Sequence, residues 1–172
     1  MALVKKRSQK QEQKTAKDLN GRPTIASGAL YFEKADVIAE NFLVECKFTD
    51  KDYYPLKKST FEKVQKEALK NNMRTPLMQV SLQGTDNPLA IMRFLDFRSL
   101  ELDKSVYDCG EVKIIDNKSF RITMEMYNSE YDIDNKMHKL TQFKFVGGKK
   151  DLHLVVLRWE DLIYILNQLK LI

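Results

Sequence analysis

The segment 32–49, FEKADVIAENFLVECKFT, consists of two apolar runs separated by a short polar pair. The runs 37–39 and 42–44 are rich in β-branched and aromatic residues, and Glu40-Asn41 between them fits a two-residue turn. This pattern predicts a β-hairpin. With Glu40-Asn41 as the loop, the antiparallel pairs are Ala39 with Phe42, Ile38 with Leu43, Val37 with Val44, and Asp36 with Glu45.

The charged residues of this hairpin form a candidate metal site. Asp36 and Glu45 would sit directly opposite each other with Cβ atoms roughly 5 Å apart, and like charges at that distance are destabilising without a compensating cation. Carboxylates and a backbone carbonyl, here that of Cys46, are the hard oxygen ligands that Mg²⁺ prefers. Lys47 shares the face of Glu45, where it could stabilise charge on an attacked phosphate or help to deprotonate a water.

A plainer interpretation of the same residues stays open. Glu45 and Lys47 could be ion-pair partners on a solvated strand face, with Asp36 part of a turn. The opposite face of the hairpin carries Val37, Val44 and Cys46, which are suited to packing against a helix.

Good helix formers predict a helix over residues 8–20, with Ser8 as its N-cap and Asn20-Gly21 as its stop. Glu12 falls on the inward stripe of this helix together with Ala16 and Leu19. Glu12 is therefore a candidate third acidic group near the metal, although a surface pair with Lys5 explains it equally well.

Helical periodicity also predicts helices over 59–71 and 160–171. The first would have Ser59 as its cap and an apolar stripe of Phe61, Val64, Ala68 and Leu69. Away from that stripe lie Lys63, Lys66 and Lys70; one of them or Gln65 could approach a phosphate, and otherwise they are solvated helix residues.

The second half of the chain is predicted to be mostly strands. Strands are expected over 76–82 and 89–94, followed by hairpins formed by 111–115 with 120–124 and by 141–146 with 152–157, with loops over 49–55 and 127–136. The segment 89–100 also resembles 154–165, since each has a strand, then an arginine and an aromatic residue, then a helix start. Together these elements predict an α/β fold with a mixed sheet, the 36–47 hairpin at its centre, and flanking helices.

Length and composition favour one domain inside a reducing compartment. A chain of 172 residues fills one core, and it has neither a secretory signal nor an apolar run near the roughly 20 residues that span a bilayer. Two distant cysteines, Cys46 and Cys109, make no disulfide framework, and His138 and His153 are too few for a structural zinc site. A cytoplasmic protein without membrane partners is expected.

Positive charge is concentrated at the start of the chain. Residues 1–22 hold seven basic and two acidic side chains, a net of +5 that equals the net charge of the whole chain. A basic segment beside a balanced domain is typical of polyanion binding, most plausibly nucleic acid, while a solubilising tail is the alternative. The candidate DNA-binding residues are Lys5, Lys6, Arg7, Lys10, Lys14 and Lys34.

Small residues join the first helix to the hairpin. The run 26–29 permits close backbone approach, and the hydroxyl of Ser27 could contact a phosphate or order the site, although such a run is more often only a turn.

The order of Glu12, RPTIASGA, KADVI and FLVECK resembles the PD-(D/E)xK nuclease superfamily, and within it the archaeal and phage Holliday junction resolvases. The match covers about residues 5–80, and Ala35 stands where the motif's name has proline. By position, Asp36 and Glu45 match the metal-binding acids, Lys47 the motif lysine, Glu12 the acid of the first helix, and Ser27 the serine ahead of the motif.

The resemblance implies a restriction-endonuclease-like fold and a homodimer that cuts branched DNA with Mg²⁺, which Mn²⁺ can replace. It implies one nuclease domain with a basic arm (1–7), a catalytic core (8–82) and an extension of sheet, hairpins and terminal helix (83–172). A phage origin would place the protein in the host-cell cytoplasm, with a role in DNA recombination and repair. Two other functions compete: a nuclease of restriction, nicking or flap specificity, and a nucleic-acid-binding protein without catalysis.

Overall fold

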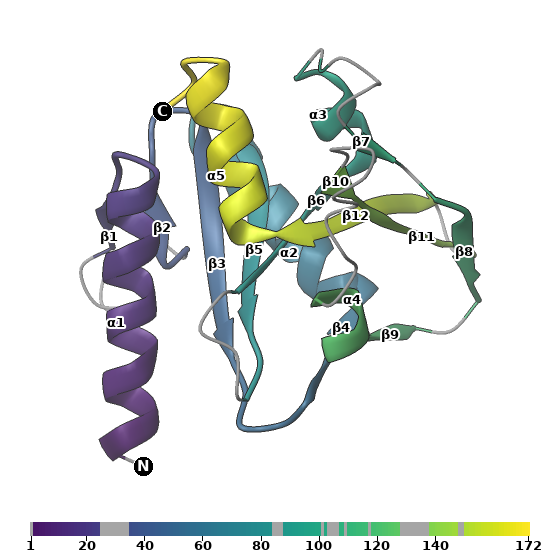
Figure 1. Cartoon of the computed structure of the whole chain (residues 1–172), viewed down its shortest axis with the longest axis horizontal. Helices are drawn as coiled ribbons and strands as arrows, with labels where there is room; N and C mark the ends of the chain where they lie inside the picture. The colour runs from purple at the N-terminus through teal and green to yellow at the C-terminus, as the bar shows by residue number, and fades with distance from the viewer. Residues whose placement is uncertain are drawn as a thin grey trace.

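The fold is given by a computed structural model of the chain (Figure 1). It describes residues 2–24, 35–83, 88–100, 102, 107–108, 110–116, 118–127, 138–147 and 150–172. For residues 2–6, 108, 124, 127, 138 and 139 it describes the backbone alone. Two positions named above, Ser27 and Lys34, and most of the loop expected over 127–136 lie outside the described residues.

Helices and strands alternate along the chain. The helices are α1 (Ala2–Asp18), α2 (Lys58–Lys70), α3 (Phe94–Arg98), α4 (Met124–Tyr127) and α5 (Trp159–Gln168). The strands are β1 (Arg22–Pro23), β2 (Val37–Ile38), β3 (Phe42–Phe48), β4 (Tyr53–Lys57), β5 (Thr75–Ser81), β6 (Leu89–Arg93), β7 (Tyr107–Asp108), β8 (Val112–Ile115), β9 (Ser119–Thr123), β10 (His138–Lys139), β11 (Thr141–Phe145) and β12 (Leu152–Arg158).

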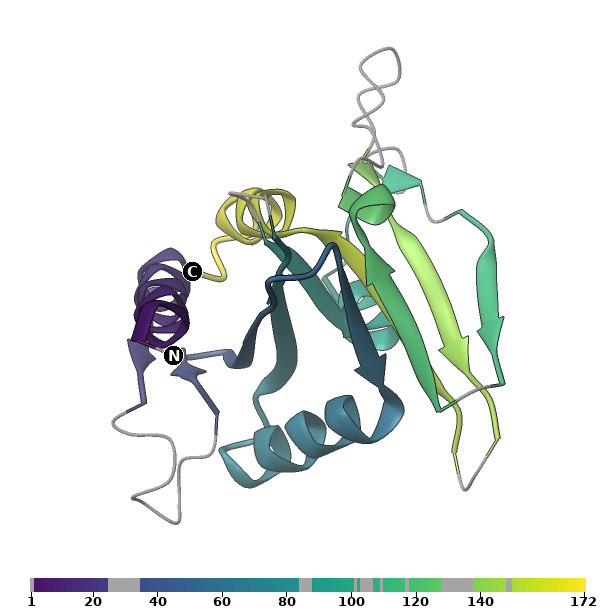
Figure 2. The same cartoon turned by 90° about the horizontal axis from the view of Figure 1, so that it is seen from below.

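Within the described residues, eight strands form one mixed sheet in the order β1-β2-β3-β5-β6-β12-β11-β8. The pairs β3–β5 and β11–β8 are parallel and the remaining pairs are antiparallel. Helix α2 covers one face, and α1 and α5 lie on the other (Figures 1 and 2). The predicted α/β fold with a mixed sheet between helices is confirmed, but the hairpin lies toward one edge of the sheet and not at its centre.

The predicted register of the hairpin is confirmed at two pairs, Val37 with Val44 and Ile38 with Leu43. Its continuation to Asp36 and Glu45 is wrong, because the ladder ends at Val37. The Asp36 N–H instead donates to the carbonyl oxygen of Val44 at 3.1 Å. Val44 thus faces both Asp36 and Val37, which is the pattern of a β-bulge.

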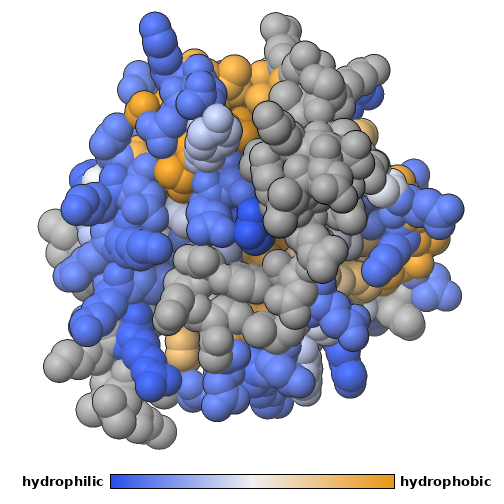
Figure 3. Space-filling view, in the orientation of Figure 1, coloured by the Kyte–Doolittle hydropathy of each residue, from blue (hydrophilic) through white to orange (hydrophobic). Residues whose placement is uncertain are grey.

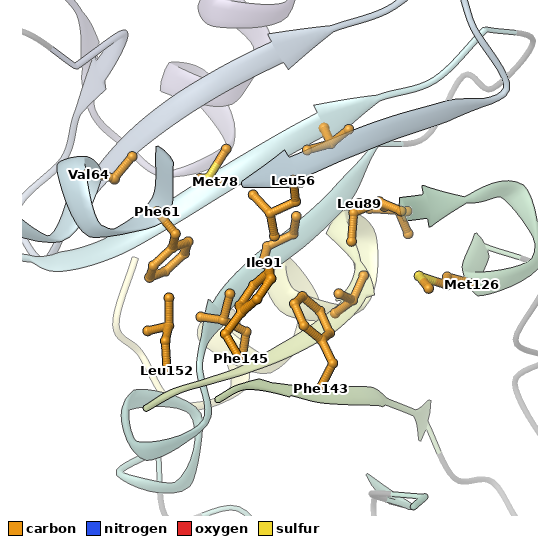
Figure 4. Close-up of a cluster of buried hydrophobic side chains, with 14 of the residues drawn as sticks. Leu56, Phe61, Val64, Met78, Leu89, Ile91, Met126, Phe143, Phe145 and Leu152 are labelled. Carbon is orange, nitrogen blue, oxygen red and sulfur yellow. The ribbon is translucent and has the colours of Figure 1, made fainter. Parts of the chain in front are cut away.

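The two faces of the sheet bury separate apolar clusters. Under α2, Phe61, Val64 and Ala68 of the helix meet side chains of β3, β5 and β6, and Phe143 and Phe145 extend this cluster (Figure 4). On the other face, Val37, Val44 and Cys46 pack with Ala16 of α1 and with Leu19 just beyond its end, as the apolar face of the hairpin predicted. The sheet is therefore fixed from both sides.

Helices α1 and α2 both begin before the residue that the sequence predicted. Helix α1 begins at Ala2, so Ser8 is an interior residue and no cap, and part of the expected arm 1–7 is helical. Helix α2 begins at Lys58, and its N-cap residue Lys57 has no side-chain hydrogen bond, so the expected cap at Ser59 is wrong. Leu69 is also 58% exposed and does not belong to the apolar stripe.

The expected hairpin of 111–115 with 120–124 is wrong. Both strands form, but β8 pairs in parallel with β11, and β9 pairs with β4 in a separate two-stranded sheet. The burial of the strands explains the exchange: Phe120 and Ile122 of β9 pack with the core cluster beneath α2, whereas β8 is exposed. Strand β4 also replaces the end of the loop expected over 49–55, and Pro55 is tolerated there because it occupies an exposed position of a two-stranded sheet.

The similarity between 89–100 and 154–165 corresponds to two equivalent strand-to-helix junctions. Arg93 pairs with Asp96 at the start of α3, and Arg158 pairs with Asp161 at the start of α5. The strands β6 and β12 that precede these helices are antiparallel neighbours in the sheet.

Among the described residues, none of the helices is long and apolar enough to cross a bilayer.

Gly21 joins α1 to the hairpin at a point where the backbone leaves no room for a side chain. A Cβ atom there would lie 2.5 Å from the carbonyl oxygen of Ile38 and 3.0 Å from Ala39. Gly21→Ala is expected to lower the free energy of unfolding by about 1–3 kcal/mol, because backbone must move to admit the methyl group. Chemical denaturation measures the change.

Gly110→Ala is the matched control, since its Cβ would meet nothing closer than the Leu140 carbonyl oxygen at 3.7 Å. Equal stability of the two variants would contradict the close approach of α1 to β2.

Candidate active site

Asp36 directly precedes β2, and it lies beside the part of β3 that continues past the last β2–β3 pair. Its carboxylate accepts a hydrogen bond from the backbone N–H of Cys46 at 2.8 Å, which satisfies a donor of β3 that β2 is too short to reach. In an antiparallel pair the N–H and C=O of one residue point to the same neighbour, so the Cys46 carbonyl faces the same strand edge as Asp36. The bulge therefore places a carboxylate and a backbone carbonyl together.

The pKa of Asp36 is raised to about 6. Burial is the largest cause of this rise, and the nearby carboxylate of Glu45 is the second. The hydrogen bond from Cys46 and the charge of Lys47 act in the opposite direction, and Glu12 adds a weaker upward effect. The three acidic residues predicted for the site are thus close enough to influence one titration. Their mutual repulsion is the electrostatic condition that a divalent cation relieves.

Glu45 and Lys47 are adjacent on the α2 side of β3, as the two-residue period predicted. The Lys47 Nζ atom lies 2.5 Å from Glu45 Oε1, and both side chains are partly buried. Burial works to lower the pKa of Lys47, but the hydrogen bond and charge of Glu45, together with Asp36, outweigh it and hold that pKa above its usual value. This arrangement therefore favours the charged form of Lys47.

Glu12 lies on α1, which packs against the other face of the sheet. It is half-buried, and it accepts a hydrogen bond from Ser8 at 3.1 Å. The neighbouring residue Gln11 donates to the side-chain oxygen of buried Gln79 at 2.9 Å, and Thr15 donates to the same oxygen at 2.7 Å. This buried polar network fixes α1 against β5 and so fixes the position of Glu12. The sequence alone does not reveal this network, since a strand glutamine carries no signal of burial.

The donor set of the site fits a hard cation such as Mg²⁺. Carboxylates of Asp36, Glu45 and Glu12 and the carbonyl of Cys46 all offer oxygen, and none of them is a sulfur or nitrogen ligand. In the described part of the chain no three acidic, histidine or cysteine side chains already converge on one point. Glu45 is turned toward Lys47 and Asp36 toward Cys46, so joint ligation requires these side chains to rotate.

A cavity of about 300 Å³ opens beside Glu45 and Lys47, between β3 and α2. Its lining residues are Ala35, Leu43, Glu45, Lys47, Ser59, Thr60, Lys63, Val64 and Glu67. The sequence offered Lys63 as one of several possible phosphate contacts and did not single out Thr60 and Glu67, although all three precede a member of the buried stripe by one position. That spacing is the signal that places them at the border between helix and sheet.

Two tyrosines of β4 lie near this region. Burial raises the pKa of Tyr54, and Lys47 opposes that rise, so Tyr54 is an electrostatic neighbour of the motif lysine. Tyr53 lies between two cations, with Lys51 Nζ 5.3 Å and the Arg121 guanidinium 4.9 Å from its ring centroid. Tyr54 also packs against the core cluster beneath α2.

The basic residues of α1 line a second cavity, of about 380 Å³, on the α1 side of β3. Arg7, Lys10 and Lys14 surround it, with Phe48, Gln79 and Ser81 among the strand residues at its base. The Arg7 guanidinium lies 3.6 Å from Asp50 and 5.8 Å from the ring centroid of Phe48. Hydrophilic side chains cover the surface over α1 (Figure 3). Lys5 and Lys6 belong to the same helix, and only their backbone is described.

Comparisons with known proteins find similarity to a solved structure. No family model matches the sequence, and no curated protein matches it. Among solved structures, the chain is similar to the 1.6 Å resolution structure of Archaeoglobus fulgidus Hjc, a Holliday junction resolvase from an archaeal hyperthermophile. The identity is 15% and the TM-score 0.44, over 69% of this chain and 88% of that chain. At these values the function has to be argued from the site's own side chains.

Proposed function

We propose that this protein is a Mg²⁺-dependent, structure-specific DNA endonuclease, with four-way junctions as its substrate. The observation that carries the proposal is the placement of Asp36, Glu45 and Lys47 at one edge of β3, where the carboxylates repel each other and the lysine stays charged. Mutually repelling carboxylates beside a lysine suit phosphodiester hydrolysis, because they can hold a divalent cation while the lysine faces the substrate phosphate.

In this mechanism Asp36, Glu45 and the Cys46 carbonyl hold the cation, with Glu12 as a further ligand from α1. A bound Mg²⁺ supplies Lewis-acid polarisation of the scissile phosphate and a lower pKa for a bound water. Lys47 neutralises negative charge that develops on the phosphate, because its own charge is held in place by Glu45. Ser27, which the family resemblance adds to this set, stays a candidate from sequence.

Arg7, Lys10 and Lys14 provide affinity for the DNA backbone, as do Lys5, Lys6 and Lys34 in the same proposal. Phosphate contacts position a nucleic acid without reading its sequence. Selecting a branched substrate requires two active sites at a fixed spacing, so the proposal includes a symmetric homodimer.

The experiment is a cleavage assay with a four-way junction, a flap and a linear duplex, each with Mg²⁺ and with a chelator. The proposal predicts Mg²⁺-dependent cutting of the junction in preference to the other two substrates. Equal cutting of all three would leave a nuclease of other specificity, and binding without any cutting would leave a DNA-binding protein without catalysis.

The basic cavity on α1 gives a separate prediction. Replacing Lys10 and Lys14 together by alanine is expected to weaken junction binding and to make the logarithmic salt dependence of the binding constant shallower by about 2, one for each lost phosphate contact. Fluorescence anisotropy at several salt concentrations measures both quantities. The paired variant Lys66→Ala with Lys70→Ala removes the same charge from exposed positions of α2 and should leave the slope nearly unchanged. Equal slopes for the two paired variants would speak against α1 as a DNA contact.

A further inference from the structure

The cavity between β3 and α2 has two walls of different chemistry. One wall carries Glu45 and Lys47 of the candidate active site, and the other carries Ser59, Thr60 and Lys63 from the first two turns of α2. The cavity, at about 300 Å³, is at the lower end of the range for small-ligand sites. Any group bound beside Lys47 therefore also faces α2.

The α2 wall is held rigidly although its polar side chains reach solvent. Phe61 and Val64, which directly follow Thr60 and Lys63 in the helix, are 0% and 4% exposed and pack into the core (Figure 4). Thr60 and Lys63 are three positions apart, so they lie on the same side of the helix. Burial of Phe61 and Val64 thus fixes the helix backbone from which the side chains of Thr60 and Lys63 extend.

The lining favours a phosphate over a base. Lys47 and Lys63 are cations, and Ser59 and Thr60 carry hydroxyl donors, a set that suits an anionic phosphodiester. The apolar lining residues among those described are Ala35, Leu43 and Val64, none of which offers the aromatic face on which bases stack. Glu67 lies two helical turns beyond Ser59, so its charge is at the far end of the helix wall from the hydroxyl groups.

We propose that Ser59, Thr60 and Lys63 form a phosphate subsite that holds the DNA phosphate next to the scissile one, so that the cleaved strand passes between β3 and α2. This proposal rests on the proposed function, because it takes Glu45 and Lys47 as the place of cleavage. Lys63 acts on the substrate through charge and position, and the residues of the cation site act on the scissile bond.

Lys63→Ala and Lys66→Ala test the proposal as a matched pair. Both positions are exposed lysines of α2, but only Lys63 lines the cavity. Affinity for a four-way junction is measured by anisotropy in Ca²⁺, which allows binding to be compared whether or not the protein cuts. Lys63→Ala should weaken binding by about 5-fold or more, Lys66→Ala by less than about 2-fold, and Lys63→Arg should restore most of the loss.

A neutral methylphosphonate at the position next to the scissile phosphate identifies the contact. The wild-type protein should lose about the same factor on this substrate as Lys63→Ala loses on normal DNA, and Lys63→Ala should lose little more on it, because both changes remove one interaction. Equal effects of the two lysine variants, or additive effects of Lys63→Ala and the methylphosphonate, overturn the subsite. If the wild type binds the junction but never cuts it with Mg²⁺, the proposed function fails, and so does the claim that this phosphate is next to a scissile bond. The two lysine variants would still show whether α2 contacts a DNA phosphate.

Discussion

Glu45→Gln is expected to lower Mg²⁺-dependent DNA cleavage by about 100-fold or more, because it removes one charged oxygen ligand from a site with few ligands. Glutamine keeps the length of the side chain and an oxygen that can accept from Lys47, which lies 2.5 Å away in the wild type. The fold and DNA binding should therefore survive. Single-turnover cleavage with saturating enzyme measures the chemical step without interference from binding.

Glu40→Gln is the matched control for this loss. Glu40 is an exposed residue in the turn of the same hairpin, five positions away, and it has no place in the site. Its cleavage rate should stay within about 2-fold of the wild type, since isolated surface charges have small effects. A Glu45→Gln variant that cuts as fast as Glu40→Gln would remove Glu45 from the mechanism.

Asp36→Asn is expected to make the metal-free protein more stable while it abolishes cleavage. The pKa of Asp36 is raised to about 6, so at pH 8 the folded state has to hold a carboxylate that burial and Glu45 disfavour. Asparagine removes that charge and keeps an oxygen for the Cys46 N–H. The gain should be about 1–2 kcal/mol at pH 8, reduced from the full value of the pKa shift because the half-buried group is screened by solvent.

The pH dependence of this gain has a definite sign. Between the ordinary pKa of 3.8 and about 6, the folded wild type binds more protons than the unfolded chain, so its stability falls relative to Asp36→Asn as the pH rises through that window. The difference should be near zero at pH 4 and reach its maximum above pH 6. Thermal unfolding of both proteins from pH 4 to 8 in a chelator measures it, and a wild type that is more stable than the variant at pH 8 would be inconsistent with the repulsion between Asp36 and Glu45.

Added Mg²⁺ should reverse the order of stability. A cation that binds only the folded state stabilises it by RT ln(1 + c/Kd), where c is the concentration of free Mg²⁺, and the wild type keeps the carboxylate that Asp36→Asn has lost. Because Asp36 has to lose its proton to bind the cation, this stabilisation and the cleavage rate should both decline as the pH falls through about 6.

The hairpin could be predicted because its apolar residues admit one register. A shift of one residue would turn Val44 and Cys46 away from α1, so burial on the α1 side fixes the pairs of Val37 and Ile38. The bulge at Asp36 could not be predicted. Nothing in the local sequence distinguishes a regularly paired strand residue from one such as Asp36, which faces the same partner residue, Val44, as the next residue in the chain does. Asp36 still lies near enough to Glu45 for that carboxylate to raise its pKa, and it accepts the hydrogen bond from Cys46.

The errors lie where partners are distant in sequence. The turn signal at 116–119 favoured a local hairpin, but Phe120 lies with its ring centroid 4.5 Å from that of Phe143, and Leu56 faces Phe120 across β4 and β9. Burial of these rings outweighs the local turn. The sequence left Lys63 as one of several possible phosphate contacts. It could not assign Lys63 to a cavity wall with Ser59 and Thr60, because the residues that line the cavity depend on which strand α2 covers.

We propose that Asp36 and Glu45 share one divalent cation, and a Mn²⁺ titration followed by electron paramagnetic resonance measures this binding. The wild type should bind Mn²⁺, Asp36→Asn and Glu45→Gln should each weaken this binding by about 10-fold or more, and Glu40→Gln should bind as the wild type does. Mn²⁺ binding that is the same in the wild type and in the double variant of Asp36 and Glu45 would rule out the shared cation.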